Sequence, residues 1–108
     1  MSANDSPPTA GPQALRAKLE AEILPAEWKM LKMHARREAL FLVAEPLELV
    51  DAALAVAQDQ PALVGAWLQS GELRRPTAAE AARWLEAEDQ PLFRAVIVQP
   101  FVLAQLDS

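Results

Sequence analysis

Apolar residues recur at helical spacing near the beginning of the sequence. Leu15, Leu19 and Ile23 lie four residues apart, and charged residues fall between them. This pattern predicts an amphipathic helix over residues 13–24. The helix is expected to end before Pro25, because the residue ahead of a proline disfavours helical backbone geometry.

A second helix is expected to begin at Pro25, since a proline in the first turn gives up no intrahelical hydrogen bond. Trp28 and Leu31 mark the inner face of this helix. The next apolar run, ALFLVA at residues 39–44, carries bulky side chains at consecutive positions. Apolar groups on both faces indicate a strand that is covered on both sides.

Two further helices are predicted by the segments PLELVDAALAVAQ and PALVGAWLQS. The first has a wide apolar face. The break between them is only Asp59-Gln60-Pro61, which requires a tight connection. Gly71 can end the second helix, because glycine adopts the left-handed conformation of a helix C-cap without strain. The two segments are therefore expected to form a helical hairpin.

The last third of the sequence predicts one more helix and a strand. Thr77 and Glu80 have the spacing of a capping box, which places the start of a helix that runs to about Ala87. The run FRAVIVQPFVLAQL that follows is rich in β-branched residues and predicts a strand. Pro100 cannot donate to a strand ladder, so an edge, a bulge or a kink is expected there.

These elements indicate an α+β fold in which a small sheet of two or three strands packs against about five helices. The strand segments are 39–44, 73–75 and 93–106. The order of elements from 26 to 75 also resembles a winged-helix core. The segment in the place of the recognition helix, PALVGAWLQS, contains no Lys or Arg. Such a topology is therefore expected to mediate protein contacts rather than DNA binding.

Length and composition indicate one domain with a modest core. The chain has 108 residues, of which 52% are apolar. This is enough apolar surface for a core without metals or crosslinks. Residues 1–12 are rich in proline and polar residues and lack apolar periodicity, so we expect a disordered N-terminal tail. Residues 13–108 are expected to form the single domain.

Charge and cysteine content exclude several classes of protein. The formal net charge is −5, which repels phosphates and anionic lipids and makes nucleic acid an unfavourable partner. No uncharged run approaches the ~20 residues that a membrane-spanning helix requires. The absence of cysteine excludes disulfides, thiolate zinc sites and thiol catalysis. We expect a cytoplasmic protein without membrane contacts.

Side chains that could perform catalysis are few. His34 is the only imidazole, and the three glycines are too scattered for a phosphate-binding loop. The acidic cluster of Glu86, Glu88 and Asp89 lacks the alternating spacing of a calcium loop. The sequence predicts no catalytic, cofactor-binding or metal-binding residue. An enzyme that uses His34 with a nearby carboxylate is the least favoured hypothesis.

Basic residues are concentrated in two short stretches. The candidate anion-binding residues are Lys29, Lys32, Arg36, Arg37, Arg74 and Arg75. Cations near a helix C-terminus are also favoured by the helix dipole, and no exposed aromatic residue is expected between them. An anion or RNA site therefore requires that the two stretches converge on one face.

Several segments together resemble a small bacterial family that is known as a domain of unknown function. They are WKML at 28–31, ALFLV at 39–43, AWLQSGELRRPT at 66–77 and FRAVIVQPFVLAQL at 93–106. The most specific element is VIVQP followed by an aromatic residue and VLxQ. A tryptophan is common in that family where Phe101 stands here. The resemblance implies one fold unit and brings no catalytic residues.

The function predicted from these observations is that of a non-enzymatic protein-interaction module, with a homodimer as one form. The contact surface is expected at the C-terminal strand, at Pro100, Phe101 and Leu103, or on the exposed part of the helical hairpin. The alternative hypothesis is an RNA- or anion-binding adaptor that uses the basic residues. No cofactor is expected in either case.

Overall fold

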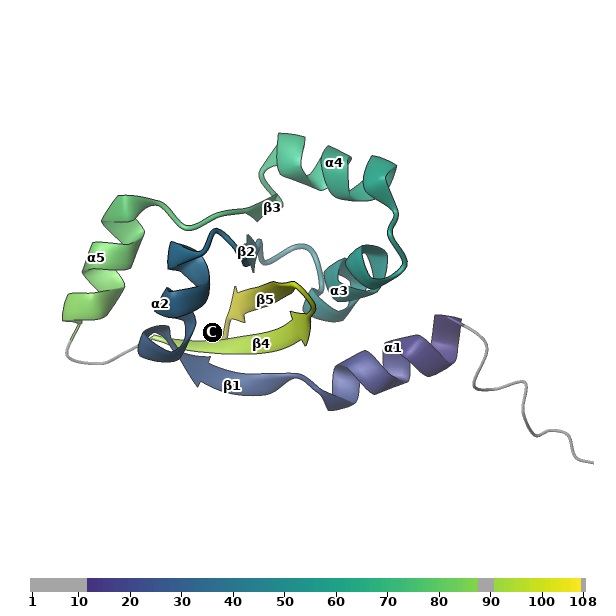
Figure 1. The fold of residues 1–108 in the computed structure, drawn as a ribbon, viewed down its shortest axis with the longest axis horizontal. Helices are drawn as coiled ribbons and strands as arrows, with labels where there is room; N and C mark the ends of the chain where they lie inside the picture. The colour runs from purple at the N-terminus through teal and green to yellow at the C-terminus, as the bar shows by residue number, and fades with distance from the viewer. Residues whose placement is uncertain (1–11, 88–90, 108) are drawn as a thin grey trace, which may run out of the picture.

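The computed structural model describes residues 12–87 and 91–107 (Figure 1). Its elements are α1 (Pro12–Ala21), β1 (Leu24–Glu27), α2 (Trp28–Arg36), β2 (Leu40–Val43), α3 (Leu49–Ala57), α4 (Pro61–Ser70), β3 (Leu73–Arg74), α5 (Ala78–Glu86), β4 (Leu92–Val98) and β5 (Phe101–Leu106). The strands form one mixed sheet in the order β1-β4-β5-β2-β3. None of the helices in these two ranges is long and apolar enough to cross a membrane.

Strand β5 lies in the middle of the sheet. It pairs antiparallel with β4 on one side and parallel with β2 on the other. Val102 has Ile97 opposite it in β4 and Leu40 opposite it in β2. The short strands β1 and β3 form the two edges, each antiparallel to its neighbour. Residues far apart in the sequence therefore meet along β5.

The α+β class is confirmed, but the sheet has five strands rather than two or three. The segment 93–106 is divided into two strands, because the chain turns back at a cis peptide bond between Gln99 and Pro100. Strand β1 was expected to belong to helices. Pro25 is accommodated there because β1 is an edge strand, which can lack one amide hydrogen.

Other boundaries differ from the expectations in part. Helix α1 ends at Ala21, and α2 begins only at Trp28, because residues 24–27 pair with β4 as strand β1. The winged-helix-like order of helix, strand, two helices and short strand is found from α2 to β3, with β3 antiparallel to β2. Here β2 also pairs with β5 and is an inner strand of the five-stranded sheet. The predicted disordered tail, residues 1–12, lies outside the described residues except for Pro12 at the start of α1.

The helices cover both faces of the sheet and create two hydrophobic cores. In Figure 1, α2 and α5 lie to the left of the β4–β5 hairpin, whereas α1, α3 and α4 lie to its right. On the α3 side, Leu49 and Val50 pack with Val96 and Leu103, and each is at most 5% exposed. Both faces of the sheet are thus buried, as the runs of consecutive apolar residues predict.

The core under α2 and α5 is aromatic. The ring centroid of Trp84 lies 5.1 Å from that of Trp28 and 5.2 Å from that of Phe93, and the three side chains are at most 6% exposed. Such tilted and edge-on contacts are the arrangement that aromatic pairs prefer. The inner-face position predicted for Trp28 is confirmed, and Trp84 is a core residue as well, while Trp67 on α4 is only partly buried.

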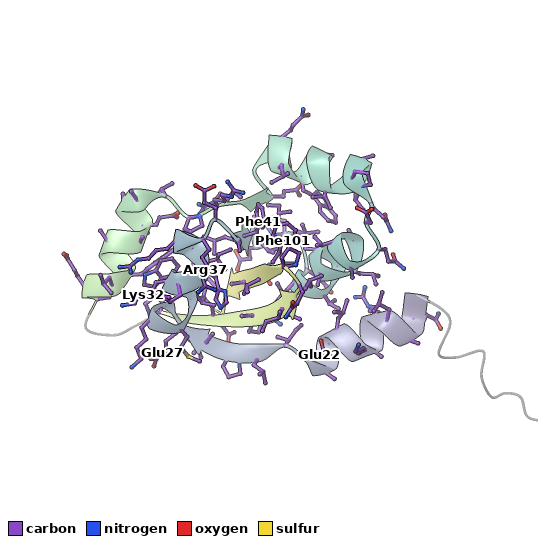
Figure 2. All side chains as sticks on the ribbon, viewed as in Figure 1. Glu22, Glu27, Lys32, Arg37, Phe41 and Phe101 are labelled. Carbon is purple, nitrogen blue, oxygen red and sulfur yellow. The ribbon has the colours of Figure 1, made fainter. Side chains whose placement is uncertain are left out.

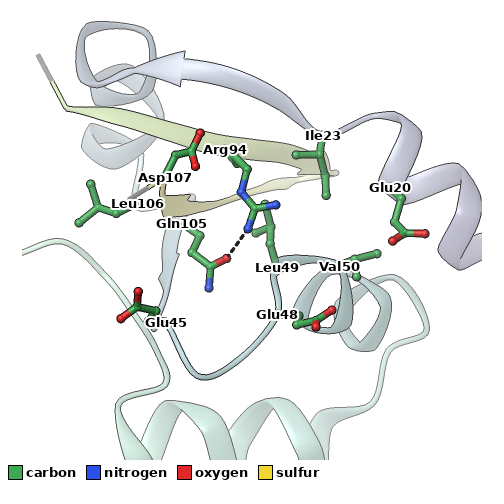
Figure 3. Close-up of a pocket in the computed structure, with 10 residues that line it drawn as sticks. All are labelled: Glu20, Ile23, Glu45, Glu48, Leu49, Val50, Arg94, Gln105, Leu106 and Asp107. Atoms are coloured by element: carbon green, nitrogen blue, oxygen red, sulfur yellow. Dashed lines mark hydrogen bonds between the residues drawn. The ribbon is translucent and has the colours of Figure 1, made fainter.

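Gln105 is a buried polar residue that ties β5 to the loop before α3. It is 6% exposed. Its Nε2 donates hydrogen bonds to the carbonyl oxygens of Ala44 at 3.0 Å and Leu47 at 2.6 Å. Its Oε1 accepts a hydrogen bond of 2.9 Å from Arg94, as Figure 3 shows. This glutamine is the last residue of the VLxQ segment, so the structure gives that position a physical role.

The capping box predicted at the start of α5 is confirmed. Thr77 Oγ1 accepts from the Glu80 amide at 3.1 Å, and Glu80 Oε1 accepts from the Thr77 amide at 3.0 Å. Arg74 adds two further hydrogen bonds to Glu80, because its Nη1 and Nη2 each donate to the Glu80 carboxylate at 2.7 Å. The hydrogen bonds from Arg74 lower the pKa of Glu80 to about 2, although its partial burial acts in the opposite direction.

The substitution Gln105→Leu is expected to lower the free energy of unfolding by about 1–3 kcal/mol, because the partly buried carbonyl oxygens of Ala44 and Leu47 lose their donor. Urea denaturation followed by circular dichroism measures this change. Gln13→Leu, at an exposed position of α1, serves as the control and should change stability by less than ~0.5 kcal/mol. Equal stability of the two variants would contradict the role given to Gln105.

The pair of Arg74 and Glu80 is expected to make stability depend on pH. Because the pKa of Glu80 is lower in the folded protein, its contribution is complete above about 4.5 and disappears as the pH falls toward 2. Glu80→Gln keeps a capping-box acceptor and should remove about 1–2 kcal/mol at neutral pH, a value reduced for the exposure of Arg74. Chemical denaturation at pH 7 and pH 3 should give a smaller difference between wild type and variant at pH 3. An unchanged difference rules out this linkage, and Glu86→Gln is the control.

Candidate functional site

Three of the six predicted anion-binding residues line one cleft between α2 and the start of α5. Lys32, Arg36 and Arg75 border this basic cleft, which has a volume of about 480 Å³ and an apolar floor that includes Trp28 and Leu40. Lys32 and Arg36 are one helical turn apart. Within the described chain, neither forms an ion pair. The structure therefore brings part of the two basic stretches together.

The other three basic residues lie outside this cleft. Arg74 is held by Glu80, as described above. Lys29 Nζ lies 3.5 Å from a carboxylate oxygen of Glu27. Arg37 follows the last residue of α2 as its C-cap and is exposed. Full convergence of the six residues is thus not found, because Arg74 is used inside the fold.

Arg75 is also partly committed to contacts within the protein. Its Nη1 lies 3.6 Å from Glu38, and its guanidinium carbon lies 5.2 Å from the ring centroid of Phe41. A cation above an aromatic ring is a favourable contact. Lys32 and Arg36 are therefore the two cations of the basic cleft with the most freedom to meet a ligand.

The residues predicted at an interface differ in exposure. Pro100 is exposed at the turn between β4 and β5. Phe101 is half-buried, with its ring edge-on to Phe41 at a centroid distance of 5.5 Å (Figure 2). Leu103 is 0% exposed and packs inside the sheet, so it has no surface to offer a partner. The expectation of an interface at Leu103 is corrected for this reason.

Helix α4 is unusual because it is apolar and yet exposed. Its sequence PALVGAWLQS contains no charged residue, and none of its residues is buried. Leu63 is 40% exposed and Leu68 is 46% exposed. Figure 1 shows α4 at the outside of the fold, between α3 and β3. A helix that is apolar all round is normally buried, so the exposure of α4 among the described residues is unusual.

A groove runs beside α4. Its volume is about 360 Å³. Its apolar lining includes Val64 and Leu68 of α4, Val56 of α3, and the two rings of Phe41 and Phe101. Phe101, one of the residues predicted at an interface, thus belongs to the same surface as α4. We call α4 and this groove the α4 surface.

A second apolar depression lies between β1, β4 and α2. Its volume is about 420 Å³, and we call it the α2 hollow. Three residues of its lining are strongly exposed: Leu24 at 64%, Met30 at 58% and Ile97 at 58%. Exposed apolar residues that are contiguous in this way indicate a binding surface. The sequence gives no signal for it, because its residues come from three separate elements.

His34 lines the α2 hollow, together with Glu22. Within residues 12–87 and 91–107, its side chain makes no hydrogen bond and no ion pair. A general base needs a group that orients its ring and a substrate within hydrogen-bond distance. The position of His34 at an apolar depression is therefore more suited to binding than to catalysis.

A further hollow of about 460 Å³ surrounds Arg94 and is drawn in Figure 3. The carboxylates that line it belong to Glu20, Glu45, Glu48 and Asp107. The described residues include no group of three or more His, Asp or Glu side chains that could hold a metal ion. Glu88 and Asp89 of the acidic cluster noted in the sequence lie outside the described residues. The hollow is thus a solvated acidic surface beside the Arg94–Gln105 contact.

Comparisons with known proteins identify the family of this chain. No curated protein sequence matches this chain. The NMR solution structure of PA1075 from Pseudomonas aeruginosa is similar, with a TM-score of 0.73 and 32% sequence identity over 99% of this chain and 94% of that one. A family model described as "Protein of unknown function (DUF2288)" matches residues 14–106. The chain therefore belongs to the DUF2288 family of proteins of unknown function.

Proposed function

We propose that this protein is a non-enzymatic interaction module that associates with a second copy of itself through the α4 surface. The observation that carries the proposal is that α4 is uncharged and apolar yet has no buried residue. Covering such a helix removes apolar area from water, which is the main driving force of protein association.

The charge distribution favours a second copy as the occupant. The chain has a net charge of −5, so two copies repel one another through most orientations. Helix α4 contributes ten residues without Asp, Glu, Lys or Arg. Two copies that meet through α4 can therefore approach without placing like charges in contact. A two-fold contact of this kind uses the same patch on both chains.

The shape of α4 also suits close packing against another helix. Ala62, Leu63 and Ala66 are exposed and lie on one side of the helix, since Ala66 follows Leu63 by three residues and Ala62 by four. Small alanine side chains allow two helix backbones to approach closely, while Leu63 supplies apolar area. The groove beside the helix, with Phe101 at its wall, extends the surface toward the turn at Pro100.

The small number of side chains that could perform catalysis supports a non-enzymatic role. His34 is the only histidine, and the sequence contains no cysteine and no tyrosine. His34 lies at the α2 hollow, where the neighbouring side chains are mainly apolar. The described groups therefore offer recognition chemistry rather than a nucleophile with an activating base.

The alternative role, an anion-binding adaptor, is supported by the shared position of Lys32 and Arg36 at the basic cleft. Two factors work against RNA as the anion. The net charge of −5 opposes a polyanion, and the aromatic rings near the cleft are buried, with Trp28 at 2% and Trp84 at 6% exposure. A smaller number of negative charges, such as those on a protein segment, fits the cleft better.

Static light scattering of the wild-type protein is expected to show the mass of two chains. Ala66→Glu should shift the protein to monomer by weakening dimerisation about tenfold or more, because a charge would be buried at the interface. Ala79→Glu makes the same change at an exposed position of α5 and is expected to remain a dimer. Circular dichroism checks that both variants are folded.

Two results would contradict the proposal. A wild-type protein that is monomeric at every accessible concentration excludes self-association. A folded Ala66→Glu variant that remains as dimeric as the Ala79→Glu control moves the interface away from α4.

A further inference from the structure

Helix α2 separates two depressions on one face of the sheet. On one side, Met30 and His34 line the α2 hollow. On the other side, Lys32 and Arg36 line the basic cleft. The members of each pair are four residues apart, so each pair lies on its own side of the helix. Figure 2 shows Lys32 on the side of α2 that faces α5.

The ridge between the two depressions is exposed. Lys29, Met33 and Arg37 follow one another at intervals of four residues, and all three are exposed. Their side chains therefore lie between the hollow and the cleft. Methionine adapts its shape to different apolar partners and is common at binding surfaces. We call the ridge and its two depressions the α2 surface.

The α2 surface is basic in a protein that is acidic as a whole. Helix α2 supplies four cations, Lys29, Lys32, Arg36 and Arg37, and Arg75 borders the basic cleft. The carboxylates that line the two depressions are fewer, Glu22 and Glu38, and the net charge of the chain is −5. The ion pair of Lys29 with Glu27 is between largely exposed side chains, which are weakly held. The other three cations of α2 form no ion pair with a described residue. A partner with negative charges is therefore attracted to this surface.

The α2 surface is also apolar. Five of the nine large apolar residues that are exposed in the described chain belong to it: Leu24, Met30, Met33, Leu85 and Ile97, with exposures of 64%, 58%, 48%, 53% and 58%. A small inorganic anion would leave all of this apolar area in water. An occupant with both apolar side chains and carboxylates satisfies the two halves of the surface together.

We propose that the α2 surface binds an acidic amphipathic segment of another protein. Apolar side chains of the segment enter the α2 hollow and contact Met30 and Ile97. Its carboxylates face Lys32 and Arg36 at the basic cleft. This binding mode lays an amphipathic element over a ridge with an apolar groove beside it.

The proposal is independent of self-association. Val64 and Trp67 of α4 are partly buried and pack against the hydrophobic core on one face of the sheet, whereas Trp28 and Leu31 of α2 belong to the core on the other face. A dimer built on the α4 surface therefore leaves the α2 surface open. A monomer leaves it open as well.

Fluorescence polarisation can test the proposal with three labelled probes. The first is a short peptide of Glu and Leu residues arranged as an amphipathic helix, and the second has Lys in place of Glu. The third is a single-stranded RNA of similar length. The Glu-Leu peptide is expected to bind at least about tenfold more tightly than the other two. No binding of the Glu-Leu peptide, equal binding of the Lys peptide, or tighter binding of the RNA overturns the proposal.

Matched variants test both halves of the surface. Arg36→Glu removes a cation of the basic cleft, and Lys18→Glu makes the same charge change on α1. Ile97→Ser removes apolar area from the α2 hollow. Leu106→Ser is its control, because it removes a similarly exposed apolar side chain (51%) outside the α2 hollow. Leu106 lies opposite Phe93, at the other end of the β4–β5 hairpin.

Arg36→Glu and Ile97→Ser are each expected to weaken binding of the Glu-Leu peptide about fivefold or more, whereas the two controls should bind like the wild type. If only Arg36→Glu weakens binding of the peptide, the binding is charge attraction alone and the proposal is overturned. If only Ile97→Ser weakens binding, the contact is purely apolar and the proposal is overturned as well. Equal loss in the controls would place the binding elsewhere.

Discussion

The position of β5 between β4 and β2 is the constraint on which the rest of the structure depends. Leu103 has Val96 opposite it in β4 and Phe41 opposite it in β2, so one strand joins segments from both halves of the chain. Its residues 102 to 104 are at most 4% exposed and contribute to the cores on both faces. The side-chain amide of Gln105 hydrogen-bonds to carbonyl oxygens of the loop before α3 and so holds this loop against β5.

Because β5 is central, the two edges of the sheet are formed by short strands, β1 and β3. Neither is well suited to pair with a strand of another chain. Strand β1 contains Pro25, and β3 has only two residues. Both features limit pairing with an additional strand. The two surfaces that we propose for recognition are accordingly built on helices. The α4 surface and the α2 surface lie on opposite faces of the sheet, so the two proposed contacts do not exclude one another.

The candidate surfaces were partly accessible from the sequence. The absence of charge in PALVGAWLQS is visible in the sequence, and so is the concentration of cations from Lys29 to Arg37. The sequence did not show which of these cations are free of contacts within the protein and so available to a ligand. Arg74 is bound by Glu80, a contact that requires the turn between β3 and α5. The α2 hollow was also missed, because Leu24 and Ile97 come together only through the pairing of β1 with β4.

The sequence by itself determined the local elements whose signals lie within a few residues: the capping box at Thr77, the left-handed Gly71 at the end of α4, and the helical hairpin. It also determined that both faces of the sheet are covered, through consecutive bulky residues. Tertiary structure alone decided that LPAE becomes a strand and that the run around Pro100 folds into two strands. Strand pairing is a contact between distant segments, so local residue pattern carries little information about partner, order or direction.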